Sequence, residues 1–235
     1  MEVATQSGPR TGDLITEDVL DGKIFSGGWR ETSERLEVHN PATDEHLASV
    51  GSAGRDDVMR ASKLAAEAQP AWAATPGPER AAILSAAADA LESAREECEW
   101  WLIHEGGGVP QKAAFEVGEA EKELRAAGAL TSGPIGEVLP NEQGRLSMAK
   151  RLPVGVVGVI APWNFPMILS MRSVAPALAL GNTVLLKCDP HTPVSGGLAF
   201  ARAFEEAEMP ENPDHAFIHH ETVAAMVDGS YWSKL

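Results

Sequence analysis

The clearest hydrophobic pattern lies in the second half of the chain, where short apolar runs alternate with stretches of helical periodicity. Apolar, β-rich runs cover residues 154–160, 183–186 and 216–218, and helical stretches cover 168–180 and 195–206. Strands buried on both faces are typical of parallel sheets whose crossovers are helices. The pattern therefore predicts an α/β fold, with a partial parallel sheet and helices flanking it.

In the first half of the chain, short strands precede helices. Residues 24–30 and 35–38, followed by the turn signal NPATD at 40–44, indicate short strands and a hairpin. Apolar residues at helical spacing then predict an N-terminal helical segment, with helices over residues 56–68, 78–104 and 112–129.

Residues 132–151 interrupt this regularity. Gly133, Pro134, Gly136 and Pro140 surround short β-capable pieces there, which predicts a protruding β-arm. We therefore expect four parts: N-terminal strands and helices (1–131), the arm (132–151), a βαβαβ core (152–220) and a divergent tail (221–235).

Charge and composition exclude some partners. The 19 basic and 34 acidic residues give a net charge of −15, which repels polyphosphates and anionic lipid headgroups at long range. Residues 1–10 lack the basic-then-apolar order of a signal peptide, and the longest apolar stretch, 154–161, is too short to span a bilayer. Two cysteines in a chain of this length argue for reduced thiols. We expect a cytoplasmic protein that binds neither nucleic acid nor membranes.

One cluster has residue types that bind metals, namely His215, His219, His220 and Glu221. Adjacent residues of a strand point to opposite faces, so His219 and His220 cannot easily share one ion. We therefore predict a surface cluster and no metal site.

Two loops follow the first two buried strands, at the edge where open parallel sheets bind ligands. The first, 161–166, reads APWNFP, and its two prolines restrict the backbone so that the Asn164 side chain can be aimed as a hydrogen-bond donor to an oxyanion. The second, 187–193, begins with Lys187, which can reach ribose hydroxyls or a phosphate. The alternatives are an asparagine that bonds its own backbone and a solvated lysine. The glycine-rich dinucleotide fingerprint is absent.

These loops and their strands resemble a known family. The segments VVGVIAPWNFP (156–166) and ALALGNTVLLK (177–187) are similar to the cofactor-domain core of the aldehyde dehydrogenase superfamily. The similarity extends more weakly over residues 24–210, and the sequences of 112–125 and 172–179 resemble those of benzaldehyde and vanillin dehydrogenases. The resemblance implies a Rossmann-like sheet, and it implies that the arm joins the chain to a second copy, as a homo-oligomer, or to a partner subunit.

The resemblance also implies roles for individual residues. Asn164 would donate to the oxyanion of the thiohemiacetal formed from an aldehyde substrate, and Lys187 would hold the adenine ribose. Family members that prefer NAD often carry a glutamate where this chain has Pro190, so both NAD and NADP stay open. The implied cofactor contacts are Ile160, Ala161, Pro162, Trp163, Lys187 and Asp189.

The family's chemistry needs a cysteine thiolate that attacks the aldehyde and a glutamate that activates water, and in the family both lie downstream of the matched segments. We therefore expect a chain truncated before the catalytic domain. Cys98 falls on the apolar stripe of its helix, and the resemblance places Cys188 at the adenosine end of the cofactor. Neither is expected to be the nucleophile.

Three functions remain open. The first is NAD(P)-dependent oxidation of an aldehyde, aromatic from the benzaldehyde and vanillin resemblance, to the carboxylic acid. The second is a non-catalytic oligomerisation or binding module that keeps the arm and part of the cofactor crevice. The third is a truncated gene product without a role of its own.

Overall fold

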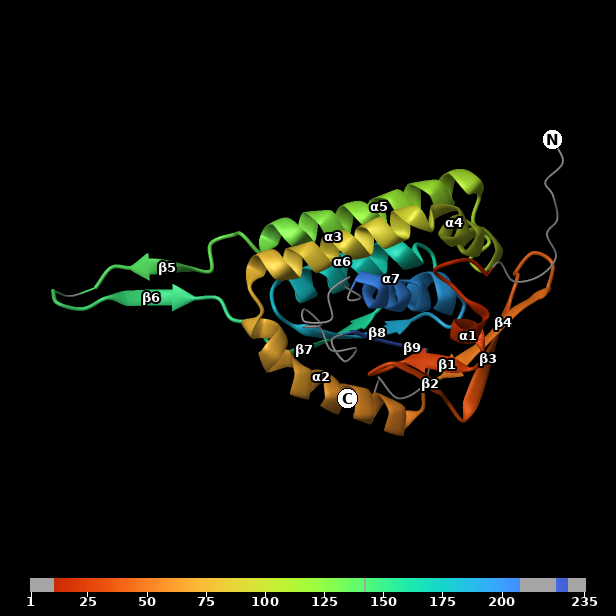
Figure 1. Cartoon of the computed structure of the whole chain (residues 1–235), viewed down its shortest axis with the longest axis horizontal. Coiled ribbons are helices and arrows are strands. Elements are labelled where there is room, and N and C mark those ends of the chain that lie inside the picture. The colour runs from red at the N-terminus through yellow and green to blue at the C-terminus, as the bar shows by residue number, and fades with distance from the viewer. Residues whose placement is uncertain (1–10, 142, 208–222, 228–235) are drawn as a thin grey trace.

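The central sheet has five strands in the order β2-β1-β9-β8-β7 (Figure 1). A computed structural model describes residues 11–141, 143–207 and 223–227 of the 235-residue chain. β7, β8 and β9 run parallel to one another, whereas β1 pairs antiparallel with both β9 and β2. The strand bounds are β1 Lys23–Phe25, β2 Trp29–Glu31, β7 Val156–Ile160, β8 Thr183–Cys188 and β9 Val223–Val227. The predicted α/β fold with a partial parallel sheet is confirmed.

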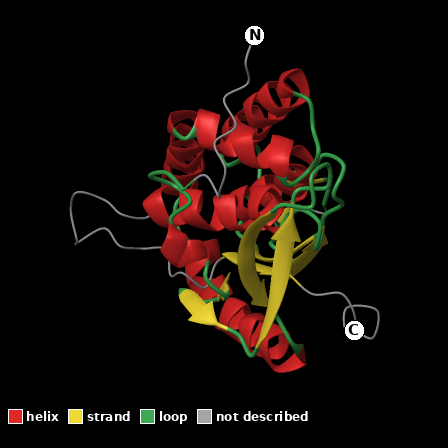
Figure 2. Cartoon of the chain, turned by 90° about the vertical axis from the view of Figure 1, so that its right-hand side faces the viewer, coloured by secondary structure: helices red, strands yellow, loops and turns green. Residues whose placement is uncertain are grey.

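Helices cover both faces of this sheet. α2 (Arg55–Ala74) packs against one face, and α6 (Pro166–Ala179) and α7 (Ala199–Ala207) pack against the other (Figure 2). A second helical layer lies over α6 and α7 and consists of α3 (Gly77–Ser93), α4 (Arg95–His104) and α5 (Pro110–Leu130). The short helix α1 (Glu17–Leu20) lies beside β1 and the strand β4 (His46–Ser52).

The alternation of side chains along β8 explains why both faces are covered. All six residues of β8 are buried. Val184 and Leu186 belong to the core on the α6 side, and Leu185 packs with the apolar face of α2 on the other. α6 contributes Met167, Met171, Val174 and Leu178, which recur at helical spacing and share that core with the fully buried Trp101.

The helix predicted over 78–104 is wrong as one element, because the structure has two helices there. α3 ends at Ser93 and α4 begins at Arg95, and Ala94 between them has φ −95° and ψ 19°, outside the helical range. The apolar spacing continues across this break, so the hydrophobic pattern carries no sign of it. The break lets α4 bring the carboxylate of Glu97 to the backbone of Leu14 and Ile15.

The C-terminal part of the sheet also differs from expectation. The strand expected at 216–218 and the histidine cluster at 215–221 lie outside the described residues. The strand that pairs with β8 on the side away from β7 is β9, at 223–227, within the segment predicted to be the tail. The helix predicted over 195–206 begins as a π-helical turn, η1 (Val194–Leu198), and continues as α7.

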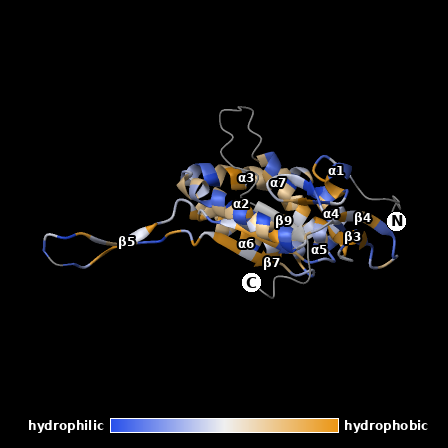
Figure 3. Cartoon of the chain, turned by 90° about the horizontal axis from the view of Figure 1, so that it is seen from below, coloured by the Kyte–Doolittle hydropathy of each residue, from blue (hydrophilic) through white to orange (hydrophobic). Residues whose placement is uncertain are grey.

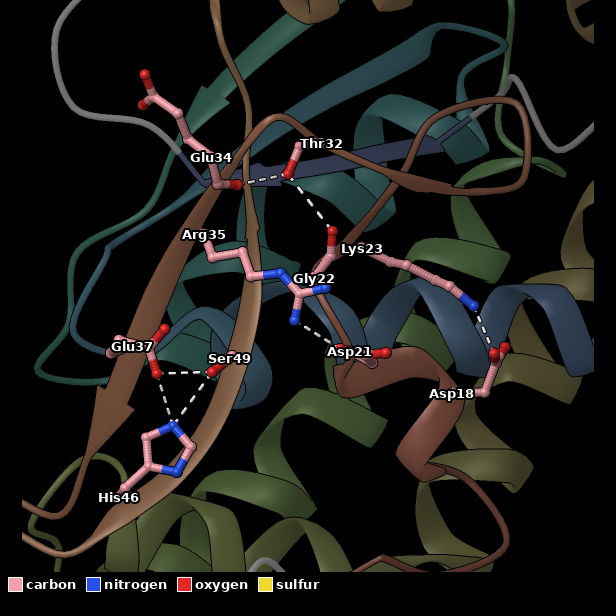
Figure 4. Close-up of polar contacts among 10 residues, drawn as sticks. All are labelled: Asp18, Asp21, Gly22, Lys23, Thr32, Glu34, Arg35, Glu37, His46 and Ser49. Atoms are coloured by element: carbon pink, nitrogen blue, oxygen red, sulfur yellow. Dashed lines mark hydrogen bonds and ion pairs between the residues drawn. The ribbon is translucent and has the colours of Figure 1, made fainter.

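The predicted N-terminal hairpin is confirmed as β3 (Glu34–His39) and β4 (His46–Ser52). Its turn is closed by Asn40, whose side-chain oxygen accepts the Ala42 N–H at 2.9 Å. On the exposed face, the Glu37 carboxylate accepts a hydrogen bond from Ser49 Oγ at 2.6 Å and lies 2.7 Å from His46 Nε2 (Figure 4). The Ser49 hydrogen bond is the main reason that the pKa of Glu37 is lowered.

The predicted arm is an antiparallel hairpin of β5 (Gly136–Leu139) and β6 (Ser147–Lys150). It extends away from the helices in two perpendicular views (Figures 1 and 3). Several of its large apolar side chains are exposed, including Val138 at 67% and Met148 at 63%. Among the described helices, none is long and apolar enough to cross a membrane.

Candidate functional site

Parallel pairing of β7 with β8 brings the two predicted loops side by side. Ile160 pairs in register with Lys187, and the Ala161 N–H donates to the Lys187 carbonyl at 3.0 Å. The side chain of Ala161 is buried, which fixes the start of the first loop. The next three residues are exposed to solvent: Pro162, Trp163 and Asn164.

The first loop leads into α6 and is held at its far end. Phe165 precedes the helix, Pro166 is its first residue, and the Lys112 ammonium lies 4.5 Å from the centroid of the Phe165 ring. Among the described residues the Asn164 side chain forms no hydrogen bond, so the alternative of an asparagine bonded to its own backbone is not seen. Its amide is therefore available to a bound molecule.

The second loop begins with a lysine that is nearly buried. Lys187 is 9% exposed, and within the described part of the chain its ammonium donates one long hydrogen bond, to the Cys188 carbonyl at 3.4 Å. An ammonium has three donors, so Lys187 retains capacity for ribose hydroxyls or a phosphate. Asp189 bonds within its own loop instead: its Oδ1 accepts the His191 N–H at 3.0 Å and lies 2.6 Å from His191 Nδ1. A dinucleotide thus fits the donor set of Lys187, whereas Asp189 shapes the loop.

Two buried glutamates, which the sequence analysis did not single out, hold the helices that follow the loops. Glu116 of α5 accepts the Met167 N–H at 2.8 Å and a hydrogen bond from Lys112 Nζ at 2.6 Å. Glu105, just past α4, accepts the Val194 N–H at 2.7 Å, the Ser195 N–H at 2.8 Å and the Ser195 Oγ–H at 2.5 Å. Burial raises the pKa of Glu105 to about 7, and its three hydrogen bonds oppose that rise.

The starts of the two following helices touch at Gly196. A Cβ atom at Gly196 would lie 3.0 Å from Pro166 Cβ and 3.6 Å from Cys188 Cβ. The Ser170 hydroxyl donates to the Gly196 carbonyl at 3.0 Å, across the same contact. Glycine at 196 therefore lets α6 and η1, the two helices that follow the loops (the loop-bearing helices), approach this closely.

Comparison with known proteins identifies the family of the chain. The sequence profile described as the aldehyde dehydrogenase family matches residues 29–228. The chain belongs to the aldehyde dehydrogenase family. A vanillin dehydrogenase of Amycolatopsis is 53% identical over 203 residues, which cover 86% of this chain and 42% of the relative.

Solved aldehyde dehydrogenase structures share the fold. The NAD-dependent benzaldehyde dehydrogenase of Corynebacterium glutamicum superposes with a TM-score of 0.80 at 39% identity, over 88% of this chain and 44% of that one. An NADP-dependent enzyme of E. coli gives a TM-score of 0.83 at 26% identity, over 93% of this chain and 44% of that one. The chain thus spans less than half the length of the aldehyde dehydrogenases it matches.

Both cysteines of the chain are buried. Cys188 lies in the fully buried strand β8, and burial raises its pKa to about 12, with the nearby Glu105 raising it further and Lys187 opposing. Burial also raises the pKa of Cys98. A thiol without solvent access or thiolate character is a poor nucleophile. Among the described residues, no group of histidine, cysteine and acidic side chains could hold a metal ion.

Proposed function

We propose that the chain binds NAD or NADP and supplies the oxyanion donor for oxidation of an aldehyde to its carboxylic acid. The observation that carries the proposal is the juxtaposition of the exposed Asn164 loop with the nearly buried Lys187 at adjoining strand ends. The names of the matched vanillin and benzaldehyde dehydrogenases favour an aromatic aldehyde. A cytoplasmic location stays a prediction.

Each predicted residue has a part in this proposal. The backbone of 160–163 would line the ribose and nicotinamide side, and Lys187 would donate to the adenine ribose. Asn164 would donate its amide N–H to the oxygen that becomes negatively charged when the aldehyde carbon is attacked. Asp189 would act indirectly, by holding the turn at His191. The cofactor, when bound, accepts the hydride.

A direct test measures cofactor binding by calorimetric titration of the purified chain. We expect saturable binding of NAD or NADP, and Lys187→Gln should weaken it about tenfold or more because a charged hydrogen-bond donor is lost. Lys150→Gln, on the exposed face of β6, is the matched control and should leave binding unchanged. No saturable binding at millimolar cofactor would overturn the proposal.

We also propose that neither cysteine is the nucleophile, so that the thiolate and the water-activating base come from residues outside this sequence. The burial of Cys98 and Cys188 supports this. The purified chain should therefore not reduce NAD or NADP in the presence of benzaldehyde. A measurable rate that Cys188→Ala abolishes would contradict this part of the proposal.

The arm supports a second candidate function, assembly with another copy or with a partner subunit. Val138 and Met148 lie directly opposite one another in the β5–β6 ladder, and both are exposed. An exposed apolar pair on a protruding hairpin is typical of an interaction surface. Size-exclusion chromatography with light scattering should show an oligomer that V138E/M148E dissociates, while Ala149→Glu on the opposite face does not. A monodisperse wild-type monomer would count against assembly.

A further inference from the structure

Each candidate loop runs into a helix whose first N–H groups are held by a buried carboxylate from the outer helical layer. Met167, at the start of α6, donates to Glu116, and Val194 and Ser195, at the start of η1, donate to Glu105. The first N–H groups of a helix lack intrahelical partners and attract negative charge. At the carboxyl edge of a parallel sheet such groups often bind a ligand phosphate. Here the protein's own carboxylates occupy them.

The second loop is therefore fixed at both ends. At one end, Lys187 lies in β8, between its backbone partners in β7 and β9. At the other end, Glu105 makes three hydrogen bonds to two consecutive residues, Val194 and Ser195, and is 2% exposed. Between these ends the loop is held by its own turn, in which the Thr192 N–H donates to the Asp189 carbonyl at 3.0 Å. Glu105 thus determines where this turn ends relative to the sheet.

We propose that Glu105 is a positioning residue for the cofactor, acting through the backbone of Val194 and Ser195 to hold the 187–193 loop where Lys187 meets the adenosine end. This inference rests on the proposed cofactor binding. It does not make Glu105 a ligand, since its carboxylate is buried and fully engaged. Loss of the carboxylate leaves a backbone N–H of η1 unpaired and frees one end of the loop.

The chain offers a matched control in Glu97. This residue lies in the first turn of α4, is 6% exposed, and accepts the Leu14 N–H at 3.3 Å and the Ile15 N–H at 2.6 Å. Like Glu105, Glu97 is thus a buried glutamate that accepts hydrogen bonds from two consecutive backbone N–H groups. These N–H groups belong to the N-terminal segment of the chain and not to the 187–196 region. A merely structural role predicts the same consequences for Glu97→Gln and Glu105→Gln.

The experiment compares wild type, Glu105→Gln and Glu97→Gln in the full chain, by titration with NAD, ADP-ribose and nicotinamide mononucleotide. Glu105→Gln should weaken NAD and ADP-ribose about tenfold, leave nicotinamide mononucleotide unchanged, and speed amide hydrogen exchange of 187–196 about tenfold without cofactor. Glu97→Gln should change none of these. If Glu105→Gln fails to fold, Ser195→Ala removes only the hydroxyl donor to Glu105 and should give a smaller change of the same kind.

The outcomes separate this inference from the proposed function. Equal effects of the two glutamine variants, or unchanged exchange in Glu105→Gln, overturn the positioning role. A uniform loss of affinity for all three ligands also overturns it, because the effect would then not be confined to the adenosine end. If the wild-type protein binds no cofactor, the proposed function is overturned. If, in that case, Glu105→Gln alone still speeds amide hydrogen exchange at 187–196, the result supports Glu105 as the residue that positions the loop.

Discussion

Replacing Gly196 with alanine tests the contact that brings the two loop-bearing helices together. The added Cβ would lie 3.0 Å from Pro166 Cβ, 3.6 Å from Cys188 Cβ and 3.6 Å from Thr192 Oγ1. The proline ring cannot rotate away, and Cys188 lies in a buried strand. The methyl group therefore fits only if α6 and η1 move apart.

Two opposing effects set the size of the change. Alanine in place of glycine in a helix favours folding by up to about 1 kcal/mol, because the unfolded chain loses freedom. Overpacking of a filled core costs about 1–3 kcal/mol. The contact is close and its partners are rigid, so the cost prevails, and we expect a net loss of about 1–2 kcal/mol. In a chain of this size that lowers Tm by about 2–8 °C.

The assay is thermal unfolding followed by circular dichroism, with Gly118→Ala as the matched control. Gly118 lies inside α5, where the nearest atom to an added Cβ is Arg95 Nη1 at 3.9 Å, an ordinary contact. That substitution should raise stability by about 0.5–1 kcal/mol. The two variants should thus move Tm in opposite directions. A Gly196→Ala protein as stable as Gly118→Ala would refute the close approach of the loop-bearing helices.

Three further predictions concern the thiols, the buried carboxylate and the start of β7. In the folded chain at pH 8 neither cysteine should react with a thiol reagent, whereas both should react in guanidinium; stoichiometric labelling of folded Cys188 would contradict its burial and raised pKa of about 12. Because the pKa of Glu105 is about 7 when folded against 4.5 for an ordinary glutamate, the folded chain binds more protons between these values. Its contribution to stability, fully present below pH 4.5, should be lost as pH rises to about 7. In urea unfolding, the free energy of unfolding should decrease less from pH 5 to pH 8 for Glu105→Gln than for wild type. Equal decreases in the two proteins would rule out this contribution of Glu105. Asn182→Ala should cost about 1–3 kcal/mol in urea unfolding, because its side chain accepts the Val154 and Gly155 N–H groups and donates to the Ala177 carbonyl. Asn182→Asp keeps the two accepted bonds and should cost less; the reverse order would show that the donated bond dominates.

The parts of the fold that the sequence predicted are those whose physical cause is local. The apolar run of β8 and the helical spacing of α6 follow from burial on both faces of a sheet, and parallel pairing then places Ile160 opposite Lys187. The arm could be predicted because glycine and proline interrupt the helical pattern there. By contrast, the break at Ala94 has no local marker, since apolar residues continue across it at the same spacing.

The buried carboxylates could not be predicted for a related reason. Glu105 and Val194 are 89 residues apart, and Glu116 and Met167 are 51 apart. In the sequence each glutamate belongs to an acidic helical segment, where a solvated side chain is the ordinary expectation. Glu105 and Glu116 differ from solvated glutamates because each accepts hydrogen bonds from the start of another helix. These hydrogen bonds depend on how α4 and α5 pack over η1 and α6.

This packing limits where the negatively charged phosphates of a dinucleotide could bind. The helix starts nearest the two loops resemble phosphate sites by position, but the Met167 N–H is already bonded to Glu116, and the Val194 and Ser195 N–H groups are bonded to Glu105. A negatively charged group brought there would find these N–H donors already engaged, and above pH 7 the ionised Glu105 carboxylate would repel it at close range. In the proposed function, the Lys187 ammonium, which still has donors available, would hold the adenosine end, and groups other than the starts of α6 and η1 would balance the charge of the cofactor phosphates. The absence of the glycine-rich fingerprint is consistent with this, because that motif serves to bring a phosphate onto a helix start that this chain has filled with its own side chains.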